Sequence, residues 1–478
     1  MSNKSKLTNT KQSARNLAIV LAGFSPCLLA LDSTPLNNTK RNMSTQILSA
    51  CAQETSTDVN ATQINSGLFQ RRCNALVGSG GGGGSFISTV NNSFSQDGDI
   101  SPLANAINRI APEQLITSGV QATRTMGNVA SIATTAISSR LTTLRTASYN
   151  ASTTQLAKAL VNSGKYSFSF NPDVRGGAAG IADTGRLGIW GNGTFNTGDV
   201  DSSTNQLGFD FDTWGGTIGA DYRVSNDLVA GLAFTYLNTD ADVTNSSGNV
   251  ESDSYTGTVY ATYSHESGFY VDGMASYGSI DFDISRNIVY NVNTNGADGI
   301  VNGTAKGDPS GAQYSFGMGI GYQFSVASAS IEPYARADYL EYEIDSYSES
   351  GATGWEARFG KQRVRSLPTT VGLRLSNAFS LPWGVLLPQI HGAWHHQFKD
   401  DKRRINAGFL GDGALLGKGP INRFNIVTEG PDRDYYTVGA SVTATLANGI
   451  TAFVAYNTLL GYRDIDSHRV TFGGRLEF

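Results

Sequence analysis

From residue 187 onward the sequence repeatedly alternates apolar and polar side chains with a period of two. The C-terminal segment shows the pattern clearly, because Val470 and Phe472 alternate with Arg469 and Thr471. Successive side chains of a β-strand point to opposite faces, so such a strand has one apolar face and one polar or charged face. A fold built from these segments must place one face against an apolar medium and the other against a polar one.

Apolar faces of the same kind recur along this whole region. Collecting the alternating segments gives about twelve strands, an even number, as bacterial outer-membrane barrels require. The sequence predicts strands near 187–197, 208–223, 228–239, 252–264, 268–284, 312–325, 329–345, 356–379, 384–400, 435–446, 449–461 and 467–478.

The connections between the predicted strands test this interpretation independently. Tight polar connections such as Ser225-Asn226-Asp227 and Ala447-Asn448-Gly449 are predicted to alternate strictly with longer polar ones. Short periplasmic turns and longer extracellular loops give this alternation, which also puts both ends of the barrel in the periplasm. A soluble β-sandwich has no such rule for every second connection. The predicted fold class of residues 187–478 is therefore an all-β membrane barrel of about 12 closed antiparallel strands.

Composition agrees with a barrel and argues against other classes. A formal net charge of −5 leaves no large basic surface, so we expect no nucleic-acid partner. No run of about 18 uncharged apolar residues follows the N-terminus, which excludes a spanning helix there, whereas alternating barrel strands average to an unremarkable hydropathy. The 55 glycines, 20 tyrosines and 22 phenylalanines favour β-structure.

Residues 1–31 have the pattern of a secretory signal peptide. Lys4, Lys6, Lys11 and Arg15 precede an apolar run from Leu17 to Leu31. This run is too short to span a membrane, so we expect cleavage near its end and export of the remaining chain.

Cysteine usage fits an exported protein. Cys51 and Cys73 remain after the signal, and an oxidising periplasm allows a disulfide between them. The bond would close a loop of about twenty residues and stabilise the segment by roughly 3 kcal/mol in the chain-entropy model. Two cysteines without a C-x-x-C motif or a nearby His do not predict a metal site.

The sequence between the signal and the strands divides into three parts. Residues 32–116 form a short, mostly helical or irregular N-terminal region with a Gly-rich linker at 78–85. Residues 117–165 are predicted to contain a helix, because apolar residues recur there at mostly three- to five-residue spacing. Its cationic, small-polar surface suits a barrel lumen better than lipid, and about twenty helical residues would thread a membrane-thick barrel. A Gly-rich connection at 166–186 leads into the barrel.

Little in the sequence points to catalysis or to a cofactor. No G-x-S-x-G, H-E-x-x-H or P-loop motif occurs, so we expect neither an enzyme nor a metal or cofactor site. One histidine-rich strand resembles the Asp/His arrangement of omptin-type barrel proteases, although polar packing in the lumen explains it more simply. Strand carboxylates are expected to be charge partners in the lumen. The side chains concerned are His391, His395, His396, Asp400 and Asp401, with the carboxylates Glu332, Asp338 and Glu341.

Short motifs follow one another along the predicted barrel. They are Phe209-Asp210-Phe211-Asp212, Gly219-Ala220-Asp221-Tyr222-Arg223, Gly268-Phe269-Tyr270-Val271-Asp272-Gly273, Glu332-Pro333-Tyr334, Trp383-Gly384-Val385-Leu386-Leu387-Pro388 and Gly473-Gly474-Arg475-Leu476-Glu477-Phe478. Together with Ile110-Ala111-Pro112-Glu113-Gln114-Leu115 before the helix, they resemble the C-terminal translocator domain of autotransporters.

This resemblance implies a place for the helix and a signal at the C-terminus. The helix of 117–165 would lie inside the barrel and join it to the exported segment. Thr471, Gly473, Leu476 and Phe478 match the spacing of the terminal signal that the barrel-assembly machinery reads. Some relatives cleave themselves within the helix at paired asparagines. The pair Asn91-Asn92 lies far upstream here, so we expect no such cleavage.

The resemblance also implies a function. The chain would insert in the outer membrane of a Gram-negative bacterium and export or tether its short N-terminal segment at the cell surface by type V secretion. Its partners would be outer-membrane lipid, the barrel-assembly machinery and periplasmic chaperones, and the barrel would be a monomer without a cofactor.

Other functions are kept as alternatives. The usual large β-helical passenger is missing, because fewer than about ninety residues separate the signal from the helix, far short of the stacked repeats of a solenoid. A small plugged outer-membrane channel or an adhesin-like surface protein is therefore the alternative function, and a barrel protease comes third.

Overall fold

The computed structural model describes residues 64–79, 110, 132–142, 144, 186–203, 207–244, 247–292, 299–326, 328–351, 353–411, 424–428, 430–446 and 450–477. The predicted signal peptide lies outside these residues, as do most of the N-terminal region and nearly all of the two Gly-rich segments.

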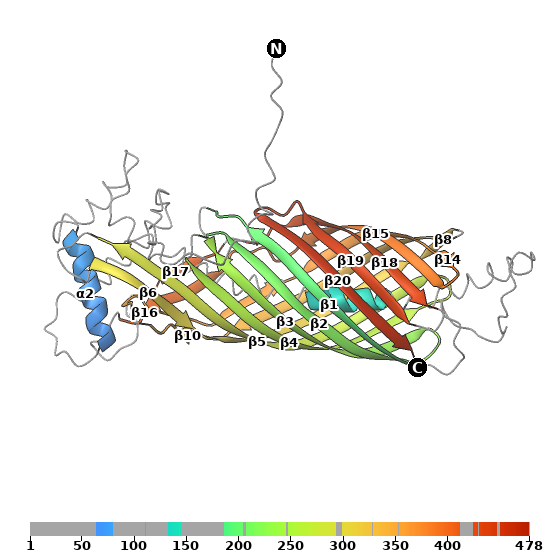
Figure 1. Cartoon of the computed structure of the whole chain (residues 1–478), viewed down its shortest axis with the longest axis horizontal. Helices are drawn as coiled ribbons and strands as arrows, with labels where there is room; N and C mark the ends of the chain where they lie inside the picture. The colour runs from blue at the N-terminus through green and yellow to red at the C-terminus, as the bar shows by residue number, and fades with distance from the viewer. Residues whose placement is uncertain are drawn as a thin grey trace, which may run out of the picture. The chain divides into compact units, whose positions relative to one another are not determined.

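Twelve antiparallel strands close into a barrel (Figure 1). Each strand pairs with its neighbours in chain order, and the last strand pairs with the first, from Gly188↔Glu477 to Val200↔Ile465. The strands are β1 (Leu187–Val200), β2 (Phe209–Arg223), β3 (Leu228–Val243), β4 (Gly248–Ser264), β5 (Phe269–Asn291), β7 (Ser310–Tyr322), β9 (Ala329–Ile344), β13 (Pro368–Asn377), β15 (Gly384–Gln397), β18 (Asp434–Leu446), β19 (Thr451–Leu460) and β20 (Ile465–Glu477).

The outer face of every barrel strand carries exposed apolar side chains. Ile218 is 67% exposed and Leu232 is 64% exposed, values that are uncommon for such residues in a protein surrounded by water. A belt of this kind fits hydrocarbon on the outside. One exposed apolar residue from each strand in turn is Ile189, Ile218, Leu232, Val259, Tyr277, Phe316, Ile331, Val371, Ile390, Val438, Val454 and Phe472.

Over much of the length that this belt surrounds, the inner face of the barrel is polar. Threonine hydroxyls pair across neighbouring strands, with 2.9 Å between the oxygens of Thr213 and Thr239 and 2.9 Å between those of Thr217 and Thr235. The seam between the first and last strands has the same arrangement, because the hydroxyls of Thr194 and Thr471 lie 2.9 Å apart. The side chains that alternate with the belt thus satisfy their hydrogen bonds inside the barrel.

All twelve predicted strands are present, but the predicted strict alternation of short and long connections is wrong. The β3–β4 connection is only 244–247 and the β19–β20 connection only 461–464, each as short as the turn 224–227 at the other end. The reason is that β3 and β4 continue their pairing as far as Val243↔Gly248, through polar residues that the sequence pattern assigned to a loop. A run of polar residues can still pair its backbone when both neighbours extend with it.

The predicted strand 356–379 is interrupted in the structure. It consists of β11 (Ala357–Phe359), β12 (Gln362–Ser366), β13 and β14 (Phe379–Leu381). At one break the Leu367 amide donates to the Gln397 side chain at 2.8 Å instead of to the ladder, which accounts for the local loss of pairing.

Four short strands at one end of the barrel were not predicted, and they pair there with one another, with β5 or with β11. We call this end of the barrel the loop end. The opposite end, where β1 begins and β20 ends, is called the turn end. β6 (Ile300–Gly307) pairs with the last residues of β5, and β10 (Tyr347–Ser348), β11, β16 (Arg404–Phe409) and β17 (Phe424–Val427) form a second sheet. β8 (Phe324–Val326) and β14 are short strands at the turn end.

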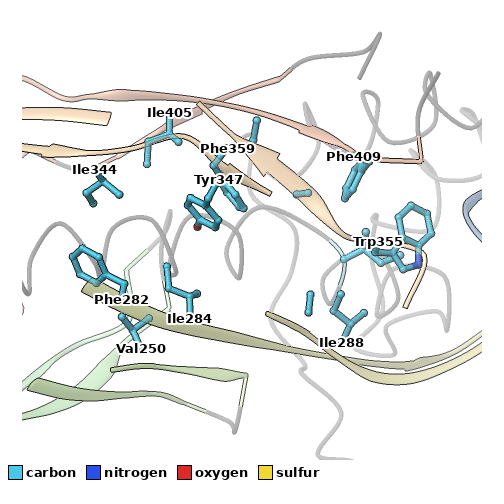
Figure 2. Close-up of a cluster of buried hydrophobic side chains, with 14 of the residues drawn as sticks. Val250, Phe282, Ile284, Ile288, Ile344, Tyr347, Trp355, Phe359, Ile405 and Phe409 are labelled. Carbon is cyan, nitrogen blue, oxygen red and sulfur yellow. The ribbon is translucent and has the colours of Figure 1, made fainter. Parts of the chain in front are cut away.

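The largest apolar core lies at the loop end, not within the belt. β5 has 23 residues, about twice the 9–11 that a strand needs to cross a bilayer, so its far half extends past the membrane. There the inward side chains change from polar to apolar and meet those of the second sheet (Figure 2). The labelled members are Val250, Phe282, Ile284, Ile288, Ile344, Tyr347, Trp355, Phe359, Ile405 and Phe409.

Helix α2 (Ile64–Ser79) packs on this core through Phe69, Cys73 and Leu76. It ends two residues inside the predicted Gly-rich linker 78–85. No helix among the described residues has the length and apolar character needed to cross a membrane.

The lipid-facing belt can be tested at Ile218, which lies near the middle of β2. Ile218→Arg should lower the free energy of unfolding from lipid vesicles by about 2–4 kcal/mol, because it puts a charge against hydrocarbon. Asp212→Arg is the matched control, since Asp212 is exposed on the same face of the same strand nearer the loop end, and it should cost about 0–1 kcal/mol. Equal effects of the two substitutions in urea titrations would contradict the assignment of the belt.

Candidate functional site: the barrel lumen and its helix

A helical segment, residues 132–142, lies inside the barrel (Figure 1, teal). Its apolar face packs against inward side chains of β1, β3, β4 and β5. This segment falls within the predicted helix of 117–165, the rest of which lies mostly outside the described residues. The buried residues of this contact are Ile137, Leu141 and Leu144 with Trp190, Val229, Ala233, Tyr260 and Met274.

The direction of the segment follows from its contacts. Ile132 packs against Leu237, whereas the later residues pack near Val229 and Ala233. Because β3 runs from the turn end to the loop end, Leu237 lies nearer the loop end. The N-terminal side of the helical segment therefore faces the loop end, and its C-terminal side faces the turn end, where β1 begins.

A buried ion pair joins the segment to the barrel wall. Arg140 Nε donates to Asp221 Oδ2 of β2 at 2.7 Å, and both side chains are about 3% exposed. Tyr260 donates to the same carboxylate at 3.2 Å and accepts from the Trp190 indole at 2.7 Å. The Arg140 guanidinium also lies 5.9 Å from the centre of the Trp190 ring. The Asp221 carboxylate thus accepts hydrogen bonds from both Arg140 and Tyr260, as a buried charge requires.

Gly188 makes room for this pair. A Cβ at Gly188 would lie 2.8 Å from Asp221 Oδ1, closer than real Cβ contacts, and 3.3 Å from Arg140 Nη2, closer than most of them. A second bond from the wall holds the helix nearer its start, where Arg469 Nη1 donates to Thr135 Oγ1 at 3.1 Å. These two contacts fix the helix to strands on both sides of the β1–β20 seam.

The helix does not fill the lumen. A cavity of about 830 Å³ lies between the helix and the opposite wall, lined largely by polar and charged side chains. Glu332 accepts from Arg374 at 2.6 Å and from Tyr270 at 2.6 Å, while Asp338 accepts from Arg336 at 2.8 Å. Glu332 and Asp338 therefore have the role of charge partners that the sequence predicted.

Glu341 is an exception to that prediction. It pairs with Arg365 of β12, whose side chain is 49% exposed, and so belongs to the outer surface beyond the membrane, not to the lumen. Glu343 continues this outer row with Arg363 and Lys361. Its bond to Glu343 raises the pKa of the Lys361 amine. The side chains of β9 that face the interior here are those of Tyr342 and Ile344, which are buried in the loop-end core.

The three histidines of β15 lie on the two faces of the strand, as the alternation of side chains along a strand predicts. His391 and His395 line the lumen cavity, and His396 lies 2.8 Å from Asp434 near the loop end. Both ring nitrogens of His395 are within hydrogen-bond distance of threonine hydroxyls, Thr370 at 2.9 Å and Thr437 at 2.8 Å. These bonds hold the His395 ring between the two neighbouring strands, as packing in a polar wall requires.

One of the two aspartates that follow these histidines lines the same cavity, and the other does not. Asp400 pairs with Arg433 at 2.9 Å on the surface, whereas Asp401 lines the cavity. Among the described residues, no group of three or more His, Cys, Asp or Glu side chains is placed to hold a metal ion.

The structure describes part of each of the other predicted sites. Thr471, Gly473 and Leu476 lie on β20, while Phe478 is outside the described residues, and the reading of this signal stays a prediction. The sulfur of Cys73 is in a disulfide. Cys51 lies outside the described residues, so the pairing of these two cysteines also stays a prediction.

Sequence reasoning missed the partners of the helix. Arg140 belongs to the cationic surface predicted for the helix, and Asp221 belongs to one of the motifs of the predicted barrel. The two are 81 residues apart, and no local pattern links them. The signal that could have found this pair is an acidic residue on the inward face of a strand. A buried carboxylate needs a cationic partner, and the predicted helix has a cationic surface.

Twelve closed strands with an apolar outer belt and a helix in a polar lumen define a class, the transmembrane barrels of bacterial outer membranes. Residues 189–457 match the family model of the autotransporter beta-domain. The match covers more than half of the 478 residues, and the chain belongs to this family. It is an outer-membrane translocator barrel of type V secretion from a Gram-negative bacterium, so the predicted fold, family and location are confirmed.

The sequence identity between this chain and two individual relatives is below 30%. The chain is 29% identical over 246 residues to Outer membrane protein A of Rickettsia conorii, covering 50% of this chain and 11% of that protein. It is 23% identical over 270 residues to Esterase EstA of Pseudomonas aeruginosa, covering 56% of this chain and 39% of EstA. The chain thus spans well under half the length of these relatives.

Among solved structures, the chain is similar to the translocator domain of the autotransporter NalP from Neisseria meningitidis. It aligns with a TM-score of 0.47 and 16% identity, covering 63% of this chain and 91% of that one.

The ion pair of the helix can be tested by a double-mutant cycle. Arg140→Ala or Asp221→Ala should each lower the free energy of unfolding by about 3–5 kcal/mol, because each leaves a buried charge without its partner. The double variant should lose less than the sum of the two. Chemical denaturation of the refolded protein in detergent measures these values.

The control is the pair of Arg463 and Asp432 on the surface, where Arg463 is 78% exposed. Arg463→Ala should cost less than about 1 kcal/mol. Losses that simply add in the Arg140/Asp221 cycle would mean that the two side chains act independently.

Proposed function

We propose that this barrel exports its own short N-terminal segment through the lumen and then keeps that segment at the cell surface through the helix that stays inside. The observation that carries this proposal is the bonded helix, whose Arg140 is paired with Asp221 of the wall. A helix held in this way connects a membrane anchor to the residues that precede it.

The direction of the helix supports export toward the loop end. Its N-terminal side faces that end, and its C-terminal side faces the turn end, where β1 begins. Since the turn end of an outer-membrane barrel is periplasmic, the loop end is the outside. α2, which packs on the loop-end core, is on the same side.

The cavity beside the helix supports passage of a chain through the lumen. About 830 Å³ remain open along the polar wall, and the side chains there already pair with one another. A passing peptide would therefore meet charged side chains that are already paired with each other, such as Arg336 with Asp338.

We further propose the partners that this assembly route requires. The barrel-assembly machinery would read Thr471, Gly473, Leu476 and Phe478, and periplasmic chaperones would carry the unfolded chain to it. Outer-membrane lipid would surround a monomeric barrel, because every one of the twelve strands contributes exposed apolar side chains to the belt.

The barrel itself is proposed to have no enzymatic activity. The hydrogen bonds of His395 to Thr370 and Thr437 support this, since they account for the histidine as part of the polar wall. One relative is named an esterase, but the chain covers 39% of that protein. The family match favours a translocator over the alternative of a channel with its own transport function.

The proposal predicts surface display of the N-terminal segment. A peptide tag inserted directly after residue 31 should be bound by antibody on intact cells and removed by added protease, while the barrel stays in the membrane. Deleting residues 117–165 should abolish display, since the segment loses its connection through the lumen. A tag that is detected only after the outer membrane is opened would contradict export.

A further inference from the structure

One face of α2 is completely buried. Phe69 and Cys73 are 0% exposed and Leu76 is 1% exposed, at spacings of four and three residues. Residues so spaced lie on the same side of a helix. Asn74, between them in sequence, is exposed on the other side. α2 thus has an inner face that packs against the barrel and an outer face in water.

The barrel side of this contact is aromatic. The Phe69 ring lies 5.3 Å from the Trp355 ring at 71° and 6.0 Å from the Phe409 ring at 36°. Trp355 and Phe409 also pack on each other, with centroids 5.4 Å apart at 74°. Edge-to-face contacts at these distances add to the gain from burial. Figure 2 shows Trp355 and Phe409 at one side of the loop-end core.

Bonds within the barrel hold Trp355 in place independently of α2. Its indole N–H donates to the Tyr290 hydroxyl of β5 at 2.7 Å, and its carbonyl accepts from Arg286 at 2.9 Å. Arg286 forms two bonds to Glu349, at 3.0 and 2.6 Å, with both side chains about 1% exposed. Glu349 in turn accepts from the Ala357 amide at 2.8 Å. The aromatic surface is therefore ordered by barrel residues before a helix arrives, which lowers the entropic cost of binding.

Two glycines let the helix come close. A Cβ at Gly354 would lie 3.1 Å from Leu68 and 3.2 Å from Arg72, and its φ of +80° is one that L-residues rarely adopt. A Cβ at Gly411 would clash with the Phe69 side chain. Arg72 also donates to the Ile300 carbonyl of β6. We call Ile300, Gly354, Trp355, Phe409 and Gly411 the helix platform.

No covalent bond outside the main chain can join α2 to the platform. The chain has three cysteines, Cys27, Cys51 and Cys73, and all of them precede the linker that follows α2. The disulfide of Cys73 therefore stays within the N-terminal segment. Apart from chain connectivity, packing and hydrogen bonding hold α2 against the platform.

We propose that the helix platform is a receptor for the exported helix α2, which stays bound to the outside of the barrel without a covalent link. This inference rests on the proposed export of the N-terminal segment and deepens it, because it names the occupant of the loop-end surface. The segment is then retained twice, by the lumen helix through the chain and by the platform through packing. Cutting the chain between the two leaves α2 at the cell surface.

The experiment cuts the chain at the Gly-rich run. A site for a sequence-specific protease is inserted within Gly80–Gly84 of the full-length protein, and a tag is placed after residue 31. Intact cells are treated with the protease, washed, and assayed for the tag over time. A denaturing gel verifies that cleavage is complete. We expect the tag to stay on the cells after cleavage.

Phe69→Ala should speed release of the tag roughly 100-fold after cleavage, as expected for loss of a buried aromatic side chain. Gly411→Val, on the platform side, should have a similar effect without any change in α2. Asn74→Ala is the matched control on the outer face of α2 and should behave like the unaltered protein.

Release of the tag from the unaltered protein as fast as from Phe69→Ala would overturn the platform as a receptor. A tag that never reaches the surface before cleavage would instead overturn the proposed export. The two failures are distinguished by the antibody signal on uncut cells.

Discussion

Backbone pairing between β1 and β20 is the interaction on which the rest of the structure depends. Its register runs from Gly188↔Glu477 to Val200↔Ile465 and joins two segments that lie almost 300 residues apart. Without it, both strands would present unpaired N–H and C=O groups to hydrocarbon, which lipid cannot satisfy. Closure also separates the lumen from the lipid, so that alternate side chains of one strand face water on the inside and hydrocarbon on the outside. The lumen, its helix and the cavity exist only because the ring is closed.

Along the barrel axis the interior changes character. Hydroxyl pairs and ion pairs line the part behind the belt, where the helical segment 132–142 is bonded to Asp221. Beyond the membrane the inward side chains of β5 and β9 become apolar and form a core with the second sheet. A polar wall lets a chain pass, whereas an apolar end gives an exported helix a surface to pack on. The polar region therefore suits export of the chain, and the apolar region suits retention of the exported helix.

The sequence predicted the features that depend on local alternation and missed those that depend on distant pairing. Twelve strands and their lipid-facing sides followed from runs such as that of Val470 and Phe472, because a period of two is a local signal. Arg140 and Asp221 could not be matched from the sequence, since the lumen brings together residues without any shared pattern. Glu341 was assigned to the wrong side, because its strand extends beyond the membrane, where charged residues also occupy the outer face. β6, β10 and β16 were missed because they are short and lie in polar connections.

The central claim is that the helix before β1 lies inside the barrel, with its N-terminal side toward the loop end. Cross-linking between helix and wall tests it most directly, in a variant whose three cysteines are replaced by serine. Thr135→Cys combined with Arg469→Cys replaces a pair that is hydrogen-bonded at 3.1 Å, and a short bismaleimide should link the two in intact membranes. Thr135→Cys combined with Leu232→Cys, on the outer belt, should give no product. A product from the second pair, or none from the first, would contradict a helix within the lumen.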